Sequence, residues 1–395
     1  MSAMPSYSVR NLPFDQARLD RIMDDAGVDV LIANSKHNVQ YLLGGHRAQF
    51  FDYMDAMGPS RYLPLVIYPK GTPERAAFIG HRLEGWQREV TPFWTPEAQT
   101  SSAGTIDAME KAVAYLRRSG VKTKNIAVEM SFLPVDAGGT LYNAFASSKF
   151  SDAHNVLERL RAVKLPDELD KLRTASEKVI ESMLAVIAMH GPGATKQELT
   201  DALRCEEVNR GLTFEYCLIA AGASHNRAPS SQRWEHGEAL SIDSGGNYHG
   251  YIGDLARMAV QGPPDEELQD LLGEIEEIQR AAFAPAKAGA LGHEIYAAAE
   301  ARLRRSPQHN HIHFVAHGMG LVSHEAPRLA PGAQGEHYGA KPLEAGMVIS
   351  VETTITHPRR GYIKLEDTVA VTPSGFEIFG EGARGWNIAG TALTA

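Results

Sequence analysis

The sequence predicts an α+β protein with two domains, a smaller α/β domain followed by a larger α+β domain. Its 395 residues suggest two or three domains, at ~100 to 200 residues each. In the first part of the chain helical and extended patterns alternate, as in α/β domains. In the second part, runs of strands stand beside helices without that alternation. We place the boundary near Lys164, which gives domains of residues 1–164 and 165–395.

Periodicity assigns the elements of the first domain. Apolar residues at helical spacing predict helices over Asp15 to Gly27 and over Ile106 to Ser119. Short runs rich in apolar and β-branched residues predict strands at residues 28–33, 62–71, 74–80 and 125–129.

Charged helical stretches mark the passage into the second domain. They cover Val156 to Lys164 and Pro166 to His190, with Pro166 well placed in a first helical turn. Thr213 to Arg257 is extended and rich in Gly and His, and the C-terminal part alternates strands with polar loops. Further helices are predicted over residues 195–210, from 265 to about 284, and over 295–305.

Composition excludes several classes of function. The 39 Lys and Arg against 48 Asp and Glu give a formal charge of −9, which disfavours binding to nucleic acid. Apolar runs fall short of the ~18 residues of a membrane span, so we expect a cytoplasmic protein with no membrane partner. Cys205 and Cys217 lack the spacing of a redox or zinc motif.

A first hairpin is predicted in ALSIDSGGNYHGYIGDLARMAV, where two β-rich runs flank a Gly/Asn centre. If the turn centres on Tyr248 and His249, Asp243 lies opposite Asp254 with both side chains on one face. Two carboxylates this close repel each other unless they share a proton or a cation.

A second hairpin is predicted in MVISVETTITHPRRGYIKLEDTVAV, with residues 357–361 as its turn. Glu352 and Glu366 are symmetric about Arg359, so they face each other across the ladder. Both carboxylates lie in runs of Val, Ile and Thr, where a charge is disfavoured without a partner. Two hairpins that each present an acidic pair indicate a cage for two divalent cations.

The stretch HNHIHFVAHGMGLVSHEAP is expected to supply the nitrogen ligand. His317 opens a Gly-flanked loop, and His324 follows seven residues later. Upstream, His225 lies on a loop entering the first hairpin, where a neutral imidazole could move a proton or hold a substrate oxygen.

The five residues Asp243, Asp254, His317, Glu352 and Glu366 stand in an order that resembles the pita-bread metallohydrolases. The motifs DSGGxxxGYxGDxxR, HGMGLxxHEAPRL, GMVxSVE and LEDTVAVT carry the likeness. That family holds methionine aminopeptidase, aminopeptidase P, prolidase and creatinase. Similarity to its longer members implies a creatinase-type N-terminal domain before a pita-bread catalytic domain.

The resemblance implies a role for each ligand. Asp243 would chelate one metal, Asp254 and Glu366 would bridge both, and His317 with Glu352 would complete the second. A bridging hydroxide would then be the nucleophile. Mn is the first metal to expect, while Co, Fe or Zn would also suit these ligands.

Further histidines and arginines match substrate-handling positions of the family. His225 and His324 match two histidines that contact substrate and assist proton transfer. His313 stands where aminopeptidase P has an extra substrate histidine, and Arg328 matches a prolidase arginine that binds the substrate carboxylate. Because longer members form dimers that share residues between active sites, we expect a homodimer, with Arg47 in a specificity segment at residues 46–53.

Departures from the family pattern leave the substrate open. Prolidases usually show Glu-Pro-Gly after the fourth ligand and an Arg two residues before the fifth, whereas this chain has Thr353, Thr354 and Lys364. The related dimethylsulfoniopropionate lyase carries an Asp where this chain has Gly245.

We therefore predict a dinuclear hydrolase of a small amide or dipeptide substrate, with Xaa-Pro dipeptides first. The alternatives are a hydrolase of a non-peptide C–N bond in an ectoine-like compound, an enzyme similar to the lyase, and a non-catalytic binding module.

Overall fold

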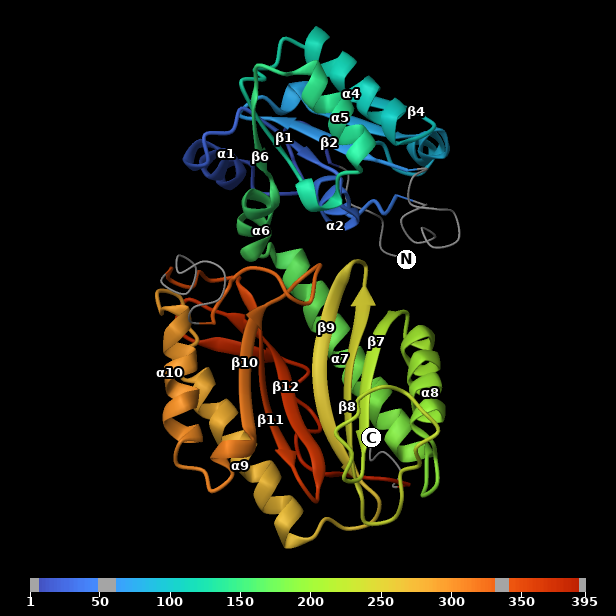
Figure 1. Ribbon diagram of the computed structural model, residues 1–395, viewed down its shortest axis with the longest axis vertical. Coiled ribbons are helices and arrows are strands. Elements are labelled where there is room, and N and C mark those ends of the chain that lie inside the picture. Colours follow the sequence, from blue (N-terminus) through green and yellow to red (C-terminus); the bar gives the residue numbers. More distant parts are fainter. Residues whose placement is uncertain (1–6, 49–61, 331–340, 391–395) are drawn as a thin grey trace. The chain divides into compact units, whose positions relative to one another are not determined.

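The computed structural model describes residues 7–48, 62–330 and 341–390, and the chain forms two compact units (Figure 1). The N-terminal unit is Met1–Leu160 and the C-terminal unit is Arg161–Ala395. The division falls within helix α6 (His154–Ala162).

The N-terminal unit consists of short helices and strands. Its helices are α1 (Gln16–Asp25), α2 (Lys36–Leu42), α4 (Thr105–Arg118) and α5 (Val135–Ala144), with 3₁₀ turns η3 (Pro73–Arg75), η4 (Arg82–Glu89) and η5 (Met130–Phe132). Its strands are β1 (Val30–Ala33), β2 (Leu65–Pro69), β3 (Ala77–His81), β4 (Glu97–Ser102), β5 (Asn125–Val128) and β6 (Lys149–Asp152).

These strands form a six-stranded mixed sheet in the order β4-β3-β2-β1-β5-β6, which confirms the predicted α/β architecture. Helices α4 and α5 bury apolar side chains against the sheet. The edge strands β4 and β6 were not predicted, because EAQTSS and KFSD contain no apolar run. Also not predicted were α2 and α5, which are short and lie close to neighbouring elements.

The C-terminal unit combines long helices with long strands. The helices are α7 (Pro166–Met189), α8 (Lys196–Asn209), α9 (Glu266–Phe283) and α10 (Gly292–Leu303), with the 3₁₀ turn η6 (His309–His311). The strands are β7 (Thr213–Ala221), β8 (Ala239–Tyr248), β9 (Tyr251–Val260), β10 (Ile312–Gly318), β11 (Val348–His357), β12 (Gly361–Val371), β13 (Phe376–Phe379) and β14 (Asn387–Ile388).

Within the described residues the strands form one sheet with the central order β10-β11-β12-β9-β8-β7, an α+β arrangement as predicted. Helix α7 packs on β8 and β9, and α9 packs on β11 and β12. Both helices pass behind the strands in Figure 1. Two apolar cores lie on this helical side, so the opposite face of the sheet is left for polar side chains.

Local signals fix where the helices of this unit begin. Pro166 occupies the first turn of α7, where its missing N–H costs nothing. Thr195 and Glu198 form a capping box at α8, and the Asp265 side chain accepts a hydrogen bond from Leu268 N at α9. Among the helices of the described segments, none has both the length and the apolar character that crossing a membrane requires.

Candidate metal centre

Strand pairing places the predicted acidic residues in one row across the sheet. Asp243 on β8 pairs with Ala256 on β9, Ala256 pairs with Glu366 on β12, and Glu366 pairs with Glu352 on β11. Paired residues share a face, and Asp254 stands two residues before Ala256 and therefore shares that face too. The small Ala256 side chain leaves room between the acidic neighbours.

The register predicted for the first hairpin is wrong by two residues. Gly245, and not Asp243, lies opposite Asp254, because His249 and Gly250 form the turn. Their φ values of 52° and 100° suit a tight turn whose twist matches the strands. Asp243 and Asp254 are consequently diagonal neighbours, which still lie on one face and within reach of one ion.

The register predicted for the second hairpin is confirmed. Glu352 lies directly opposite Glu366, and the strands turn at His357–Gly361. The neighbouring strand β10 pairs Val315 with Glu352, and His317 follows two residues later on the same face. Strands β8, β9, β11 and β12 carry the acidic ligands, and β10 carries His317. All five expected ligands thus lie on one side of the sheet.

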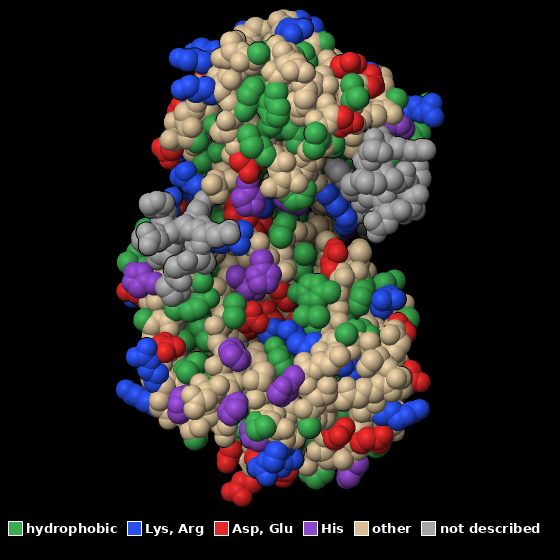
Figure 2. Space-filling model, in the orientation of Figure 1, with side chains coloured by type: hydrophobic (Ala, Val, Ile, Leu, Met, Phe, Trp, Pro, Cys, Tyr) green, Lys and Arg blue, Asp and Glu red, His purple; other side chains and the backbone are tan. Residues whose placement is uncertain are grey.

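These side chains line a cavity of about 300 Å³ in the C-terminal unit. Its walls contain the five expected ligands and His324, together with Tyr216, Arg227 and Lys364. Figure 2 shows acidic, basic and histidine side chains gathered over the strands on this face of the unit. The volume is at the lower end of that of small-molecule sites, so a compact substrate would fit.

His317 presents a bare ring nitrogen to the acidic residues. Its Nδ1 lies 3.2 Å from Gly318 O, which favours the tautomer with the proton on Nδ1. Its Nε2 lies 3.7 Å from Glu352 Oε1 and has no hydrogen-bond partner among the described residues. Burial lowers the pKa of His317, so the ring is neutral. Its Nε2 then carries a lone pair that can bind a cation.

Three of the ligands are close enough to hold one ion. Single ligand atoms of Asp254, His317 and Glu366 all lie within 4.8 Å of one another, and all three side chains are buried. Burial, Glu366 and Asp243 raise the pKa of Asp254 well above its usual range. A divalent cation would remove this repulsion, and an imidazole with several carboxylates suits Mn, Fe, Co or Zn. The residues present therefore fit a metal ion.

Three side chains in the cavity were missed as site residues. The Tyr216 hydroxyl donates a hydrogen bond to Asp254 Oδ1, and Arg227 and Lys364 both pair with Asp243 Oδ2. Lys364 could have been found, because a residue two positions before Glu366 on a strand must share its face. Arg227 lies in the loop between β7 and β8, whose path no local pattern predicts.

His324 lies at the cavity beside the expected metal ligand His317. The two rings stack with centroids 3.7 Å apart. Burial and the neighbouring His317 lower the pKa of His324 to about 4. Near neutral pH the ring is therefore an uncharged base at the edge of the cavity.

The remaining histidines and the arginine of the prediction are not part of the cavity lining. His225 is exposed, and its Nε2 lies 3.2 Å from the backbone oxygen of His357. His313 is exposed on β10, on the same face as His317 but four residues before it. Arg328 is half-buried and close enough to His324 to lower its pKa further.

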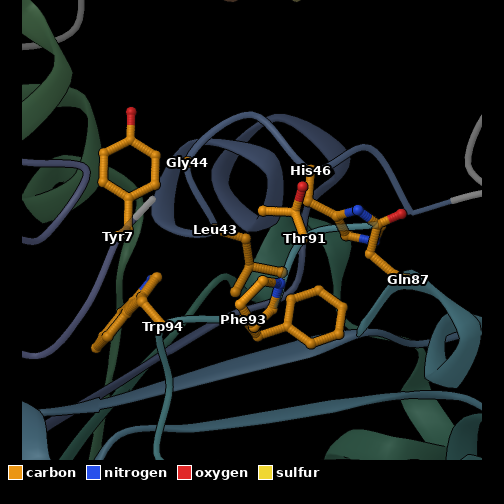
Figure 3. A pocket seen from close by; sticks show the side chains of 9 residues that line it. Tyr7, Leu43, Gly44, His46, Gln87, Thr91, Phe93 and Trp94 are labelled. Carbon is orange, nitrogen blue, oxygen red and sulfur yellow. The ribbon is translucent and has the colours of Figure 1, made fainter. Parts of the chain in front are cut away.

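The predicted specificity segment belongs to the N-terminal unit, and residues 49–53 of it lie outside the described residues. Arg47 is half-buried, and His46 Nε2 lies 2.7 Å from Glu84 Oε2. His46 also borders a small pocket with Leu43 and Phe93 (Figure 3). That pocket, of about 20 Å³, has room for a single water and is too small for a substrate.

Comparison with known families covers both units. Residues 170–373 match the model of metallopeptidase family M24, and residues 16–163 match the model of the creatinase/prolidase N-terminal domain. The predicted fold, a creatinase-type domain before a pita-bread domain, is thereby confirmed.

Individual relatives are similar over nearly the whole chain. The probable dipeptidase PepE of Mycobacterium bovis is 27% identical over 363 residues, which are 89% of each chain. The Xaa-Pro dipeptidase of Lactobacillus delbrueckii subsp. lactis is 24% identical over 92% of this chain and 95% of its own. The solved structure of the Xaa-Pro dipeptidase from Bacillus anthracis superposes with a TM-score of 0.79 at 22% identity, covering 94% of this chain and 98% of that one.

Proposed function

Because the chain belongs to metallopeptidase family M24, we propose that it hydrolyses the amide bond of a small substrate, with Xaa-Pro dipeptides as the first class to test. The observation that carries the proposal is the row of ligand side chains beside a cavity of about 300 Å³. Relatives named Xaa-Pro dipeptidase support the substrate class.

The metal would be held by buried side chains from the strands. Asp254, His317 and Glu366 supply three ligand atoms, and Glu352 lies beside His317. A bound divalent cation would lower the pKa of water, so that hydroxide is available to attack near neutral pH. It would also polarise the scissile carbonyl. Mn is the first metal to test, and Co, Fe or Zn would suit the same donors. The sequence predicts a second cation, but Lys364 lies among the ligands that would hold it.

His324 is proposed to act as the proton carrier. Its pKa of about 4 keeps the ring neutral, so it can accept a proton from the attacking water and return it to the leaving amine. His225 is proposed as a second proton-handling or substrate-contacting residue. Its exposed position would then require substrate to reach the β7–β8 loop, where its neighbour Arg227 already faces the cavity.

Substrate contacts are proposed for His313 and Arg328. His313 shares the site face of β10, and Arg328 offers a planar guanidinium that could bind a substrate carboxylate with two hydrogen bonds. In the N-terminal unit, Arg47 is proposed to select substrate in a homodimer, where it would reach the partner's cavity.

Hydrolysis of a panel of Xaa-Pro dipeptides by the Mn²⁺-reconstituted protein tests the proposal, with Asp254→Ala as the blank. Turnover well above the blank, with little on dipeptides without proline, is the expected result. A preparation that carries its metal and yet releases no proline from any dipeptide would overturn the substrate class.

A hydrolase of a non-peptide amide is the second candidate. Its support is the departure from the prolidase pattern at Thr353, Thr354 and Lys364. An enzyme similar to the lyase has less support, since the space beside Gly245 is filled by the Tyr216 ring, only 2.3 Å from where a Cβ would stand.

A further inference from the structure

The side chain of Lys364 lies inside the cluster of expected metal ligands. Its Nζ lies within ion-pair distance of a carboxylate oxygen on each of three ligands, namely Asp243 (2.5 Å), Glu352 (2.5 Å) and Glu366 (2.7 Å). The side chain is only 4% exposed. A lysine side chain is an ammonium near neutral pH, and the three carboxylates around this one stabilise its charge. Lys364 therefore places a positive charge among the expected ligands.

Two cationic side chains of the protein form ion pairs with the Asp243 carboxylate. Arg227 pairs with the same Oδ2 atom that Lys364 contacts. The guanidinium of Arg227 also lies over the Tyr362 ring, 4.7 Å from its centroid, which keeps it in place. A carboxylate whose Oδ2 already has two cationic partners is a weaker metal ligand than one without them.

The other end of the cluster has the opposite character. There, the ligand atoms of Asp254, His317 and Glu366 converge, and His317 Nε2 lacks a hydrogen-bond partner within the described part of the chain. Neither Lys364 nor Arg227 forms an ion pair with Asp254 in the described structure. Lys364 contacts Glu352 and Glu366 through Oε2 of each, whereas their Oε1 atoms lie 3.7 and 4.0 Å from His317 Nε2, so a divalent cation at this end need not displace Lys364.

Charge balance leads to the same conclusion. Asp243, Asp254, Glu352 and Glu366 carry a formal charge of −4, and Lys364 with Arg227 contributes +2. One divalent cation then brings the cluster to zero, whereas two would leave a surplus of +2. Uncompensated charge in a buried site is strongly unfavourable, so a neutral cluster is favoured.

We propose that Lys364 takes the place of a second cation, so that the centre binds one divalent ion tightly, at Asp254, His317, Glu352 and Glu366. Asp243 then serves as the anchor for Lys364 and Arg227, and does not chelate metal. The inference rests on the proposed function for the presence of a metal, and it alters the number of ions that the sequence predicts.

Metal counting on the full chain tests this inference. The protein is stripped with chelator, reconstituted with excess Mn²⁺, desalted, and measured by inductively coupled plasma mass spectrometry and by isothermal titration of Mn²⁺. We expect one equivalent per chain in the wild type. Lys364→Met, which keeps the length of the side chain but removes its charge, should bind a second equivalent. Lys171→Met, which removes a lysine paired with Asp167 on α7, is the matched control and should bind one.

Two tight equivalents in the wild type would overturn the proposal, and one equivalent in folded Lys364→Met would show that Lys364 is not what excludes the second ion. If Lys364→Met fails to fold, the Mn²⁺ electron paramagnetic resonance spectrum of the wild type decides. An isolated ion supports the proposal, whereas an exchange-coupled pair contradicts it. Because neither readout needs a substrate, a one-metal protein that cleaves no dipeptide would refute only the proposed substrate class.

Discussion

The imidazole rings of His317 and His324 lie face to face, with centroids 3.7 Å apart and ring planes inclined by 23°. Two protonated rings at this distance would repel each other. Burial and His317 lower the pKa of His324 to about 4, and burial lowers that of His317 too. The stack therefore stays neutral at pH values where a histidine with an unshifted pKa is partly protonated.

Acid should destabilise the folded chain in part through His324. Its pKa is about 4 when folded and 6.5 otherwise, so between these values the unfolded state binds more protons. The stabilisation is thus complete above the unfolded pKa and is lost as the pH falls toward 4. We expect the Tm of metal-free His324→Gln to fall less than that of the metal-free wild type when the pH is lowered from about 7 to about 5. Equal losses, measured by circular dichroism, would contradict this.

Glu366→Ala should remove both metal and activity. The Glu366 carboxylate is 1% exposed, and its Oε1 accepts a hydrogen bond of 2.7 Å from Ser350 Oγ. Loss of a ligand should cost more than the ~10- to 100-fold in metal affinity that loss of a supporting hydrogen bond costs. Metal content after dialysis and turnover should fall together, while the exposed Glu377→Ala stays like the wild type. A fully active, metal-loaded Glu366→Ala protein would refute the site.

Tyr216→Phe should weaken metal binding while preserving the shape of the cavity. The hydroxyl of Tyr216 donates to Asp254 Oδ1, and its ring fills the space beside Gly245. Phenylalanine keeps the ring and removes only the hydrogen bond that orients the ligand. We expect Mn²⁺ affinity to fall by about 10- to 100-fold, as for other residues that support ligands. Competition with a chromophoric chelator measures it, and unchanged affinity would show that the hydroxyl has no orienting role.

The two hairpins show which strand pairings could be predicted from the sequence. The second turn has three residues, centred on Arg359 between the paired His357 and Gly361, so Glu352 and Glu366 pair as their symmetry about Arg359 predicts. In the first, the turn lies one residue later than expected, because His249 and Gly250 adopt positive φ. A one-residue error in the turn centre moves the partner of a residue by two, which changes the pair but preserves the face. The cluster could therefore be predicted although one register was wrong.

Charge pairing across strands is harder to predict. Lys364 is visible in the sequence as a departure from the family, and its face follows from strand periodicity. Nothing local indicates that its ammonium reaches three carboxylates, because side-chain reach depends on the approach of β8, β11 and β12. Arg227 comes from an irregular loop and could be placed only by the structure.

Arg257→Ala should destabilise the C-terminal unit. Arg257 is fully buried, and it joins β9 to β12 through the Asp367 carboxylate (2.8 Å) and the Glu366 backbone oxygen (2.8 Å). Removing one partner leaves a buried carboxylate with Arg384 alone, and breaking such pairs costs about 3–5 kcal/mol. Arg280→Ala on the exposed side of α9 should cost less than ~1 kcal/mol. Urea unfolding of metal-free protein measures both, and similar losses would contradict the argument.

Arg47→Ala should lower catalytic efficiency without removing metal, if the N-terminal unit selects substrate in a dimer as proposed. Arg47 lies in the segment expected to approach the partner's cavity, and it belongs to the N-terminal unit, which contributes none of the expected metal ligands. A lost charged hydrogen bond to substrate, worth ~1.5–3 kcal/mol, corresponds to about a 10- to 100-fold fall in kcat/KM. Metal content should stay at the wild-type level.

The control and the oligomeric state separate this role from a structural one. Arg82→Ala removes an exposed arginine from the same unit and should leave kcat/KM unchanged. Light scattering should give the mass of a dimer, and dilution to the monomer should reduce the wild-type activity toward that of Arg47→Ala. Wild-type kinetics in Arg47→Ala, or a fully active monomer, would assign substrate selection to the C-terminal unit alone. His313 and Arg328 would then be the residues to substitute.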